Sequence, residues 1–145
     1  MPTFNFSHPV EVRYADIDAQ GHLNNAKFIT FMEHARFKYI ERVGLWRLAD
    51  GFENLGQIIA SVSCDYKRPV TLGQVVVVQA RMVRLGTKSM EMEFRFTVDA
   101  SDGGDRVEVA LGHSVQVAHD FKAEQSRPIP AHWRELIGQF EGWPA

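Results

Sequence analysis

One long amphipathic helix, set among strand patterns, constrains this chain more than any other feature. Between residues 25 and 43 apolar residues recur at steps of three and four, which places them on one helix face. They are Phe28, Ile29, Met32, Ala35, Tyr39, Ile40 and Val43. Asn24 offers a side-chain oxygen as N-cap, and Gly44 suits the C-terminal stop. We therefore predict a helix over residues 25–43, the only long helix indicated by the sequence.

Strand patterns dominate the remainder of the chain. Residues 9–14 are predicted as a first strand, and residues 58–66, 74–84, 90–98 and 107–117 as four more. The segment 90–98 alternates most strictly between apolar and polar residues. In the last strand, Val107, Val109, Leu111, His113, Val115 and Val117 are expected to share one face. Another shared face is expected for Ile58, Ala60, Val62, Cys64 and Tyr66. Cys64 and His113 are accordingly interpreted as core residues, and residues 131–140 suit a short C-terminal helix.

This order of elements predicts an α+β fold. Strands grouped after one helix favour an antiparallel sheet of about five strands, with the single long helix covering one of its faces. The 145 residues suit one domain, residues 1–145. Such a sheet keeps an exposed edge and part of a bare face, so we expect the chain to dimerise.

Composition excludes several classes of protein. The net charge of −2 lacks the basic excess that binding to nucleic acid or to a membrane surface needs. A single cysteine, Cys64, permits no internal disulfide. There is no basic segment followed by an apolar one at the N-terminus, and no apolar run approaches the length of about 18 residues that suggests a membrane span. We expect a cytoplasmic protein without a membrane span.

The densest polar stretch, residues 14–25, lies between the first predicted strand and the long helix. Asp16 and Asp18 stand close to the helix N-terminus, whose free N–H groups stabilise an oxyanion, and Gly21 lets the backbone pass close to a ligand. On a structural interpretation, the two aspartates form local turns and Asn24 only caps the helix. The residues by themselves leave both interpretations open.

A resemblance bears on this choice. The segment Asp16-x-Asp18-x-x-Gly21-His22-x-Asn24-Asn25-x-x-Phe28, followed by Glu33-x-Ala35-Arg36, resembles the signature of the 4-hydroxybenzoyl-CoA thioesterase-like acyl-CoA thioesterases of the hot-dog superfamily. Further matches are Asp65-Tyr66-x-Arg68-Pro69-Val70-x-x-Gly73, Gly86-x-Lys88-Ser89 and Pro128-Ile129-Pro130. The resemblance covers nearly the whole chain. It implies a hot-dog fold, in which the sheet wraps around one long central helix.

The resemblance also implies an activity and a set of roles. The chain would hydrolyse an acyl-CoA, with Asp18 as nucleophile or general base and the backbone N–H at Asn25 polarising the thioester carbonyl. Contacts to the substrate or to CoA would come from Gly21, His22, Asn24, Tyr66 and Lys88. No metal or cofactor is required, because thiolate is a fair leaving group. The chain would be a homodimer or homotetramer with active sites at the subunit interface.

Several residues carry alternative interpretations. Some family members place a His seven positions after the catalytic Asp; here that position is Asn25, so His22 either orients Asp18 or packs in the loop. Glu33 and Arg36, three residues apart on the helix, are interpreted as a structural ion pair. The scattered histidines show no metal-ligand spacing. Candidates for the CoA phosphates are Lys67, Arg68, Arg84 and Lys88, of which Lys88 is preferred.

Two other functions remain open at this point. A hot-dog hydratase or dehydratase would need a carboxylate paired with a His, for which Asp18 and His22 are the best candidates. A non-catalytic acyl-CoA-binding protein would keep the fold without the chemistry. The sequence determines neither the acyl group nor the carrier, CoA or acyl-carrier protein.

Overall fold

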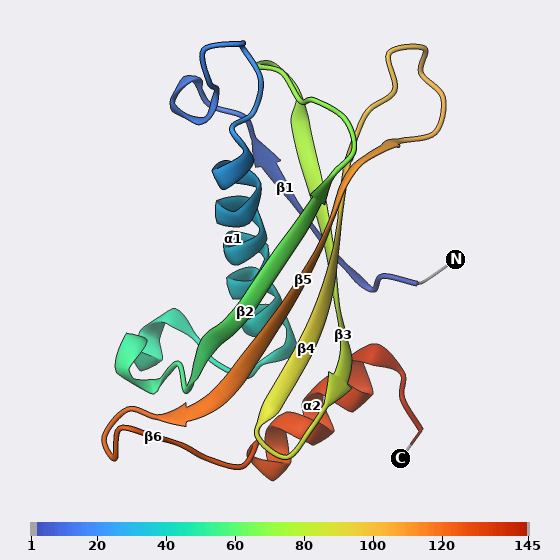
Figure 1. The fold of residues 1–145 in the computed structure, drawn as a ribbon. Helices are drawn as coiled ribbons and strands as arrows, with labels where there is room; N and C mark the ends of the chain where they lie inside the picture. Colours follow the sequence, from blue (N-terminus) through green and yellow to red (C-terminus); the bar gives the residue numbers. More distant parts are fainter. Residues whose placement is uncertain (1–2, 145) are drawn as a thin grey trace.

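Residues 3–144 of the protein fold into one curled sheet and two α-helices. The computed structural model describes residues 3–144 (Figure 1). The elements are β1 (Phe6–Glu11), α1 (Asn25–Val43), β2 (Gln57–Tyr66), β3 (Val75–Leu85), β4 (Ser89–Val98), β5 (Val107–Asp120), β6 (Gln125–Ser126) and α2 (Ala131–Glu141), with short 3-10 turns at Tyr14–Asp16, Leu48–Asp50 and Phe52–Asn54. The predicted α+β class is confirmed. Neither helix is long and apolar enough to cross a membrane.

The strands run antiparallel in the order β1-β3-β4-β5-β2, and β6 pairs with the end of β5. The sheet curls around α1, which lies against one of its faces (Figure 1). The predicted sheet of about five strands around one long helix is therefore confirmed. The first strand begins and ends three residues earlier than the predicted 9–14, because the chain turns at Tyr14–Asp16.

Helix α1 begins and ends where its capping residues predict. The Asn24 side chain accepts a hydrogen bond from the N–H of Ala26 (2.8 Å), and Gly44 adopts the left-handed conformation (φ 93°) that ends a helix. The buried face of α1 comprises Phe28, Phe31, Met32, Ala35, Arg36, Tyr39, Ile40 and Val43. Burying this apolar stripe against the sheet supplies most of the stability of such a helix.

The expected face of β5 is wrong over most of its length. Its small and polar residues face α1 and are buried, namely Ala110, Gly112, Ser114, Gln116 and Ala118, whereas Leu111, Val115 and Val117 lie on the other face. A Cβ atom at Gly112 would lie 2.5 Å from Sδ of Met32, so the Met32 side chain fills the space that a larger residue would need. His113 is consequently not a core residue: its side chain is 43% exposed, and Nε2 lies 3.9 Å from Oε1 of Glu91.

Strand β2 also departs from its predicted pattern. A bulge between Ile59 and Ser61 inserts a residue, so Ile58 pairs with the outward Val117, whereas Val62 and Cys64 pair with inward residues of β5. The five residues 58, 60, 62, 64 and 66 therefore do not share one face. Cys64 is half-buried against the core, as predicted for a small core residue. Burial raises the pKa of its thiol to about 11, which keeps it protonated.

Candidate active site

The loop before α1 is built around the carboxylate of Asp16. This side chain is fully buried and accepts hydrogen bonds from the backbone N–H of Arg13 (2.9 Å) and from its Nε (3.1 Å) and Nη2 (2.9 Å). The Asp16 carbonyl accepts from the N–H of Asn24 (2.9 Å), which ties the loop to the helix cap. Hydrogen bonding from the Arg13 guanidinium is the main cause that lowers the pKa of Asp16. Asp16 is therefore a structural carboxylate.

Asp18 is held differently. Its Oδ1 accepts from the N–H groups of Gln20 (2.9 Å) and His22 (3.3 Å), and its own N–H donates to the His22 carbonyl (2.8 Å). Within residues 3–144, Oδ2 has no hydrogen-bond partner. One oxygen thus anchors the loop in the turn that the structural interpretation expected, and the other is available for chemistry.

Gly21 and His22 shape this turn through their backbones. Gly21 adopts φ 79°, a conformation that favours glycine, and its N–H donates to the Asp18 carbonyl (3.0 Å). The backbone of His22 bonds to Asp18 and bridges to Thr71. The contact between His22 and Asp18 is thus made by the backbone of His22, and among the described residues the imidazole makes no hydrogen bond.

The N-terminus of α1 presents free donors beside Asp18. Asn25 is the first residue of the helix, so its N–H has no acceptor within the helix, and it makes no hydrogen bond elsewhere in residues 3–144. From β2, the Tyr66 hydroxyl donates to the Asn25 carbonyl (2.9 Å), and its ring meets that of Phe28 edge-on at 5.1 Å. The first turn of α1 is thereby tied to the end of β2.

A pocket of about 330 Å³ joins these groups. Four of the predicted site residues line it together: Asp18, His22, Asn25 and Tyr66. Gly21 and Asn24 stand outside the lining, as turn and cap. The other lining residues are Gln20, Leu23, Phe28, Lys67, Arg68 and Pro69. Of these, Gln20, Leu23, Phe28 and Pro69 were not predicted as site residues. Phe28 could have been found from its spacing, because it follows Asn25 by three residues and so lies on the same face of the helix, one turn further along.

Lys88 does not join this pocket within one chain. It lies in the turn between β3 and β4, at the opposite end of the sheet from the loop before α1 (Figure 1). Its Nζ is 3.2 Å from the Ser126 hydroxyl. The sequence could not show that Lys88 lies far from Asp18, because that distance depends on the length and direction of β3.

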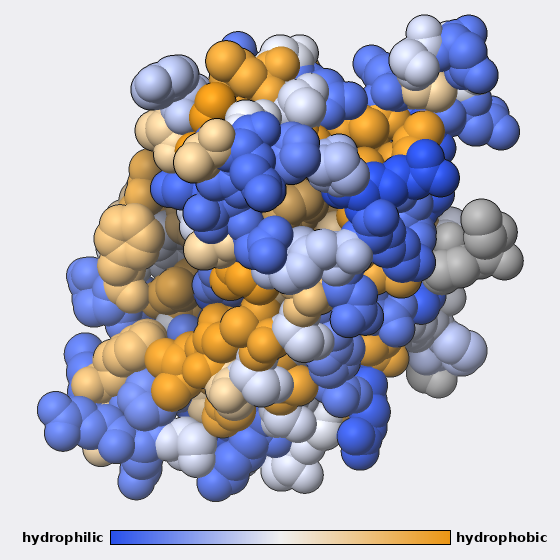
Figure 2. Space-filling model, turned by 45° about the horizontal axis from the view of Figure 1, so that its top comes forward, coloured by the Kyte–Doolittle hydropathy of each residue, from blue (hydrophilic) through white to orange (hydrophobic). Residues whose placement is uncertain are grey.

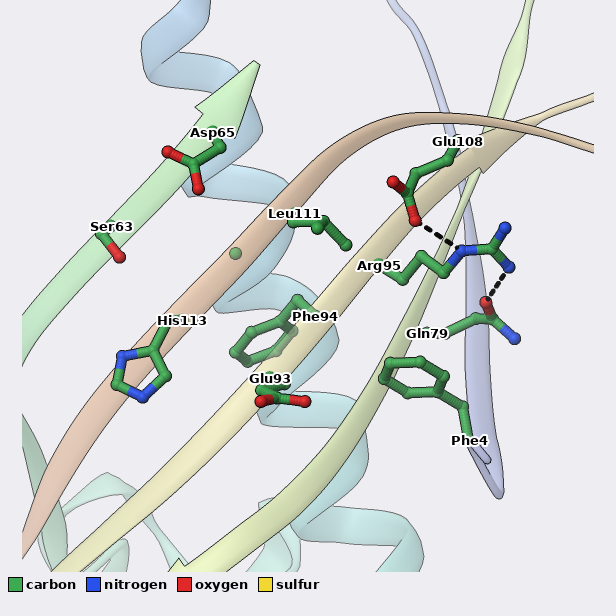
Figure 3. Close-up of a pocket in the computed structure, with 11 residues that line it drawn as sticks. Phe4, Ser63, Asp65, Gln79, Glu93, Phe94, Arg95, Glu108, Leu111 and His113 are labelled. Atoms are coloured by element: carbon green, nitrogen blue, oxygen red, sulfur yellow. Dashed lines mark hydrogen bonds and ion pairs between the residues drawn. The ribbon is translucent and has the colours of Figure 1, made fainter. Parts of the chain in front are cut away.

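A larger hollow, of about 490 Å³, lies on the sheet face turned away from α1 (Figure 3). Three of its charged side chains are already paired: Nε of Arg95 donates to Glu108 (2.9 Å) and Nη1 to Gln79 (3.2 Å), and Glu93 pairs with Arg81. Asp65 also lines this hollow. No helix N-terminus in residues 3–144 faces this hollow. The pocket at Asp18 is therefore the better candidate active site despite its smaller size.

Comparison with known proteins shows the family of this chain. The family model of the thioesterase-like superfamily matches residues 12–137. The chain belongs to the thioesterase-like superfamily. It is thus a thioester hydrolase, and the matched range includes every residue of the candidate active site.

Individual proteins described as thioesterases match this chain over almost its full length. The long-chain acyl-CoA thioesterase FadM of Escherichia coli K12 is 24% identical over 135 residues, which are 90% of this chain and 95% of FadM. A thioesterase from Thermus thermophilus, solved with coenzyme A and Zn, is 35% identical with a TM-score of 0.82, covering 99% of this chain and 100% of that one. 4-Hydroxybenzoyl-CoA thioesterase from Pseudomonas sp. strain CBS-3 is 16% identical with a TM-score of 0.79, covering 90% and 97%. The predicted hot-dog fold is confirmed.

Proposed function

We propose that this protein hydrolyses acyl-CoA thioesters to a free acid and CoA, using Asp18 and the N-terminus of α1. The observation that carries the proposal is that the half-buried Asp18 and the free N–H of Asn25 line one pocket. The superfamily, together with relatives described as acyl-CoA thioesterases, supports the substrate class.

The geometry suits attack on a thioester carbonyl. With its carbonyl oxygen at the Asn25 N–H, the substrate would present its carbonyl carbon to Asp18 or to a water that Asp18 deprotonates. The carbonyl oxygen becomes negative, and the carbonyl re-forms as the C–S bond breaks and the thiolate of CoA leaves and takes up a proton. If Asp18 attacks directly, the mixed anhydride that forms is hydrolysed by water, which releases the acid and restores the carboxylate. If Asp18 acts as base, the proton that it takes from water passes to the thiolate. The helix N-terminus stabilises the transient oxyanion, and removing one such donor typically costs about 10²–10³ in rate. Asp18 acts as nucleophile or as general base.

Other groups in the pocket have supporting roles in this proposal. His22 contributes its backbone N–H to Oδ1 of Asp18, and Gly21 allows the turn that places it there. Asn24 caps α1, and Tyr66 ties the helix to β2 beside the bound substrate. The site is proposed to work without a metal or cofactor.

We propose that the functional unit is a homodimer or homotetramer. Strand β2 is an edge of the sheet, and on it Ile58 (41%), Val62 (40%) and Tyr66 (43%) are substantially exposed. Figure 2 shows hydrophobic residues gathered on the surface between hydrophilic regions. A second copy on this edge would cover these residues and come to lie beside the pocket, because Tyr66 lines it. Lys88, the proposed contact to CoA phosphate, would then serve the active site of another subunit.

The proposed function is tested by free-thiol release from acyl-CoAs with short, medium, long and aromatic acyl groups. We expect thiol release from at least one of them. Enoyl absorbance is followed in the same samples. A change in enoyl absorbance without thiol release would favour the hydratase. Binding of an acyl-CoA with neither thiol release nor a change in absorbance would favour a non-catalytic acyl-CoA-binding protein.

A further inference from the structure

Arg68 is the one arginine that lacks a partner within residues 3–144. Seven other arginines, Arg106 among them, form ion pairs with carboxylates. The carboxylates are those of Asp16, Glu33, Asp50, Glu93, Glu91, Glu108 and Asp99. Arg42 and Arg127 lie over the aromatic rings of Phe140 and Trp133, and Arg134 donates to the carbonyls of Gly86 and Thr87. Arg68 makes none of these contacts. A guanidinium left free beside a pocket is suited to bind an anion.

The position of Arg68 connects it to the chemistry. It follows β2 by two residues, is exposed, and lines the pocket that also contains Asp18 and Asn25. It also borders a second hollow, of about 260 Å³, whose one acidic residue, Asp99, is already paired with Arg106. The neighbouring Lys67 is not equivalent, because its Nζ is bound to Glu108 at 2.7 Å.

We propose that Arg68 binds an anionic group of the thioester substrate, a carboxylate or a phosphate, at the rim of the candidate active site. This inference rests on the proposed function. The planar guanidinium donates two parallel N–H bonds to two oxygens of such a group. Arg68 would therefore select among thioesters by charge, while Asp18 and Asn25 act on the carbonyl.

Two parts of a thioester could supply this anion. One is a carboxylate at the free end of the acyl chain, and the other is a phosphate of CoA, which the pantetheine arm separates from the sulfur. Thioesters of pantetheine keep the arm and lack the phosphate, so they distinguish the two sources.

The test compares wild type with Arg68→Gln on four substrates. They are the acyl group released fastest from CoA and the same chain ending in a carboxylate, each as CoA and as pantetheine thioester. Arg47→Gln is the matched control, because Arg47 is exposed and pairs with Asp50 away from the pocket. Arg68→Gln should raise KM about tenfold or more for the substrates that carry the recognised anion, with kcat little changed.

Each outcome has one meaning. A rise in KM for carboxylate-bearing esters on both carriers supports the acyl carboxylate, and a rise for both CoA esters only supports the phosphate. An unchanged KM on every charged ester overturns the inference, as does an equal rise on the uncharged pantetheine ester. Absence of thiol release by wild type from every acyl-CoA would instead contradict the proposed function, which separates the two failures.

Discussion

The loop before α1 contains two carboxylates, Asp16 and Asp18, whose roles differ because their surroundings differ. Asp16 is buried and engaged by Arg13 through three hydrogen bonds, so a substrate has no access to it. One carboxylate oxygen of Asp18 accepts hydrogen bonds from the backbone, and the other accepts none within residues 3–144. At the residue scale, we therefore predict a loss of stability at one position and a loss of catalysis at the other.

Asp16→Asn should destabilise the fold by about 1–2 kcal/mol, because the amide replaces a charge-assisted acceptor. The pKa of Asp16 is lowered below its ordinary value of 3.8, so its contribution is fully present at neutral pH and is lost as the pH falls below that value. Denaturant unfolding of both proteins from about pH 7 to about pH 3 should show the difference narrowing in acid. A difference that stays constant over this range would contradict the role given to Asp16.

At the scale of elements, α1 packs mainly against β1, β2 and β3, and its Met32 side chain reaches Gly112 of β5. Gly112 faces the helix at a point where Met32 leaves no space for a Cβ atom, and the neighbouring inward positions of β5 are small or polar. The helix whose N-terminus forms the candidate active site thus meets β5 through the Met32 side chain, opposite small and polar residues.

Gly112→Ala should cost about 1–3 kcal/mol, because the new methyl group must displace the buried Met32 side chain. The free energy of unfolding measured with denaturant checks this value. Gly138→Ala, at a position of α2 where a Cβ meets nothing within 4 Å, is the matched control and should not destabilise. Equal stability of Gly112→Ala and wild type would show that the helix does not pack as described.

The same elements show how far the sequence predicts the structure. The bounds of α1 follow from Asn24, Gly44 and its apolar spacing, which are local signals. The face of β5 does not, because hydrophobic alternation points to Leu111 and Val115, whereas the Met32 side chain fills the space over Gly112.

The candidate site was likewise only partly predictable. Asp18, His22 and Asn25 are close in sequence and could be grouped by motif, and Tyr66 by resemblance. Lys67 and Arg68 look alike in the sequence, and only the position of Glu108 shows which of them is paired. The remoteness of Lys88 from Asp18 depends on the whole sheet.

At the scale of the whole molecule, the open edge at β2 explains why one chain leaves apolar residues exposed next to its pocket. Pairing of two such edges would extend the sheet and bury Val62 and Tyr66. The pocket would then be completed by a second subunit, so activity and assembly should be lost together.

Val62→Lys should therefore yield monomers, because a charge would be placed in the apolar part of the proposed interface. Light scattering coupled to gel filtration measures the mass, and thiol release measures activity. Leu48→Lys is the control, since Leu48 is 60% exposed and lies off this edge. An oligomer with full activity in the Val62 variant would place the interface elsewhere.

The most direct test of the central claim is thiol release by Asp18→Asn. The amide keeps an oxygen for the bonds from Gln20 and His22, so the loop should fold, and it cannot act as nucleophile or base. We predict a fall in kcat of about 10²–10⁴, whereas Glu33→Gln, which removes the helical carboxylate paired with Arg36, should stay active. Thiol release by Asp18→Asn at the wild-type rate would contradict the catalytic role of this carboxylate.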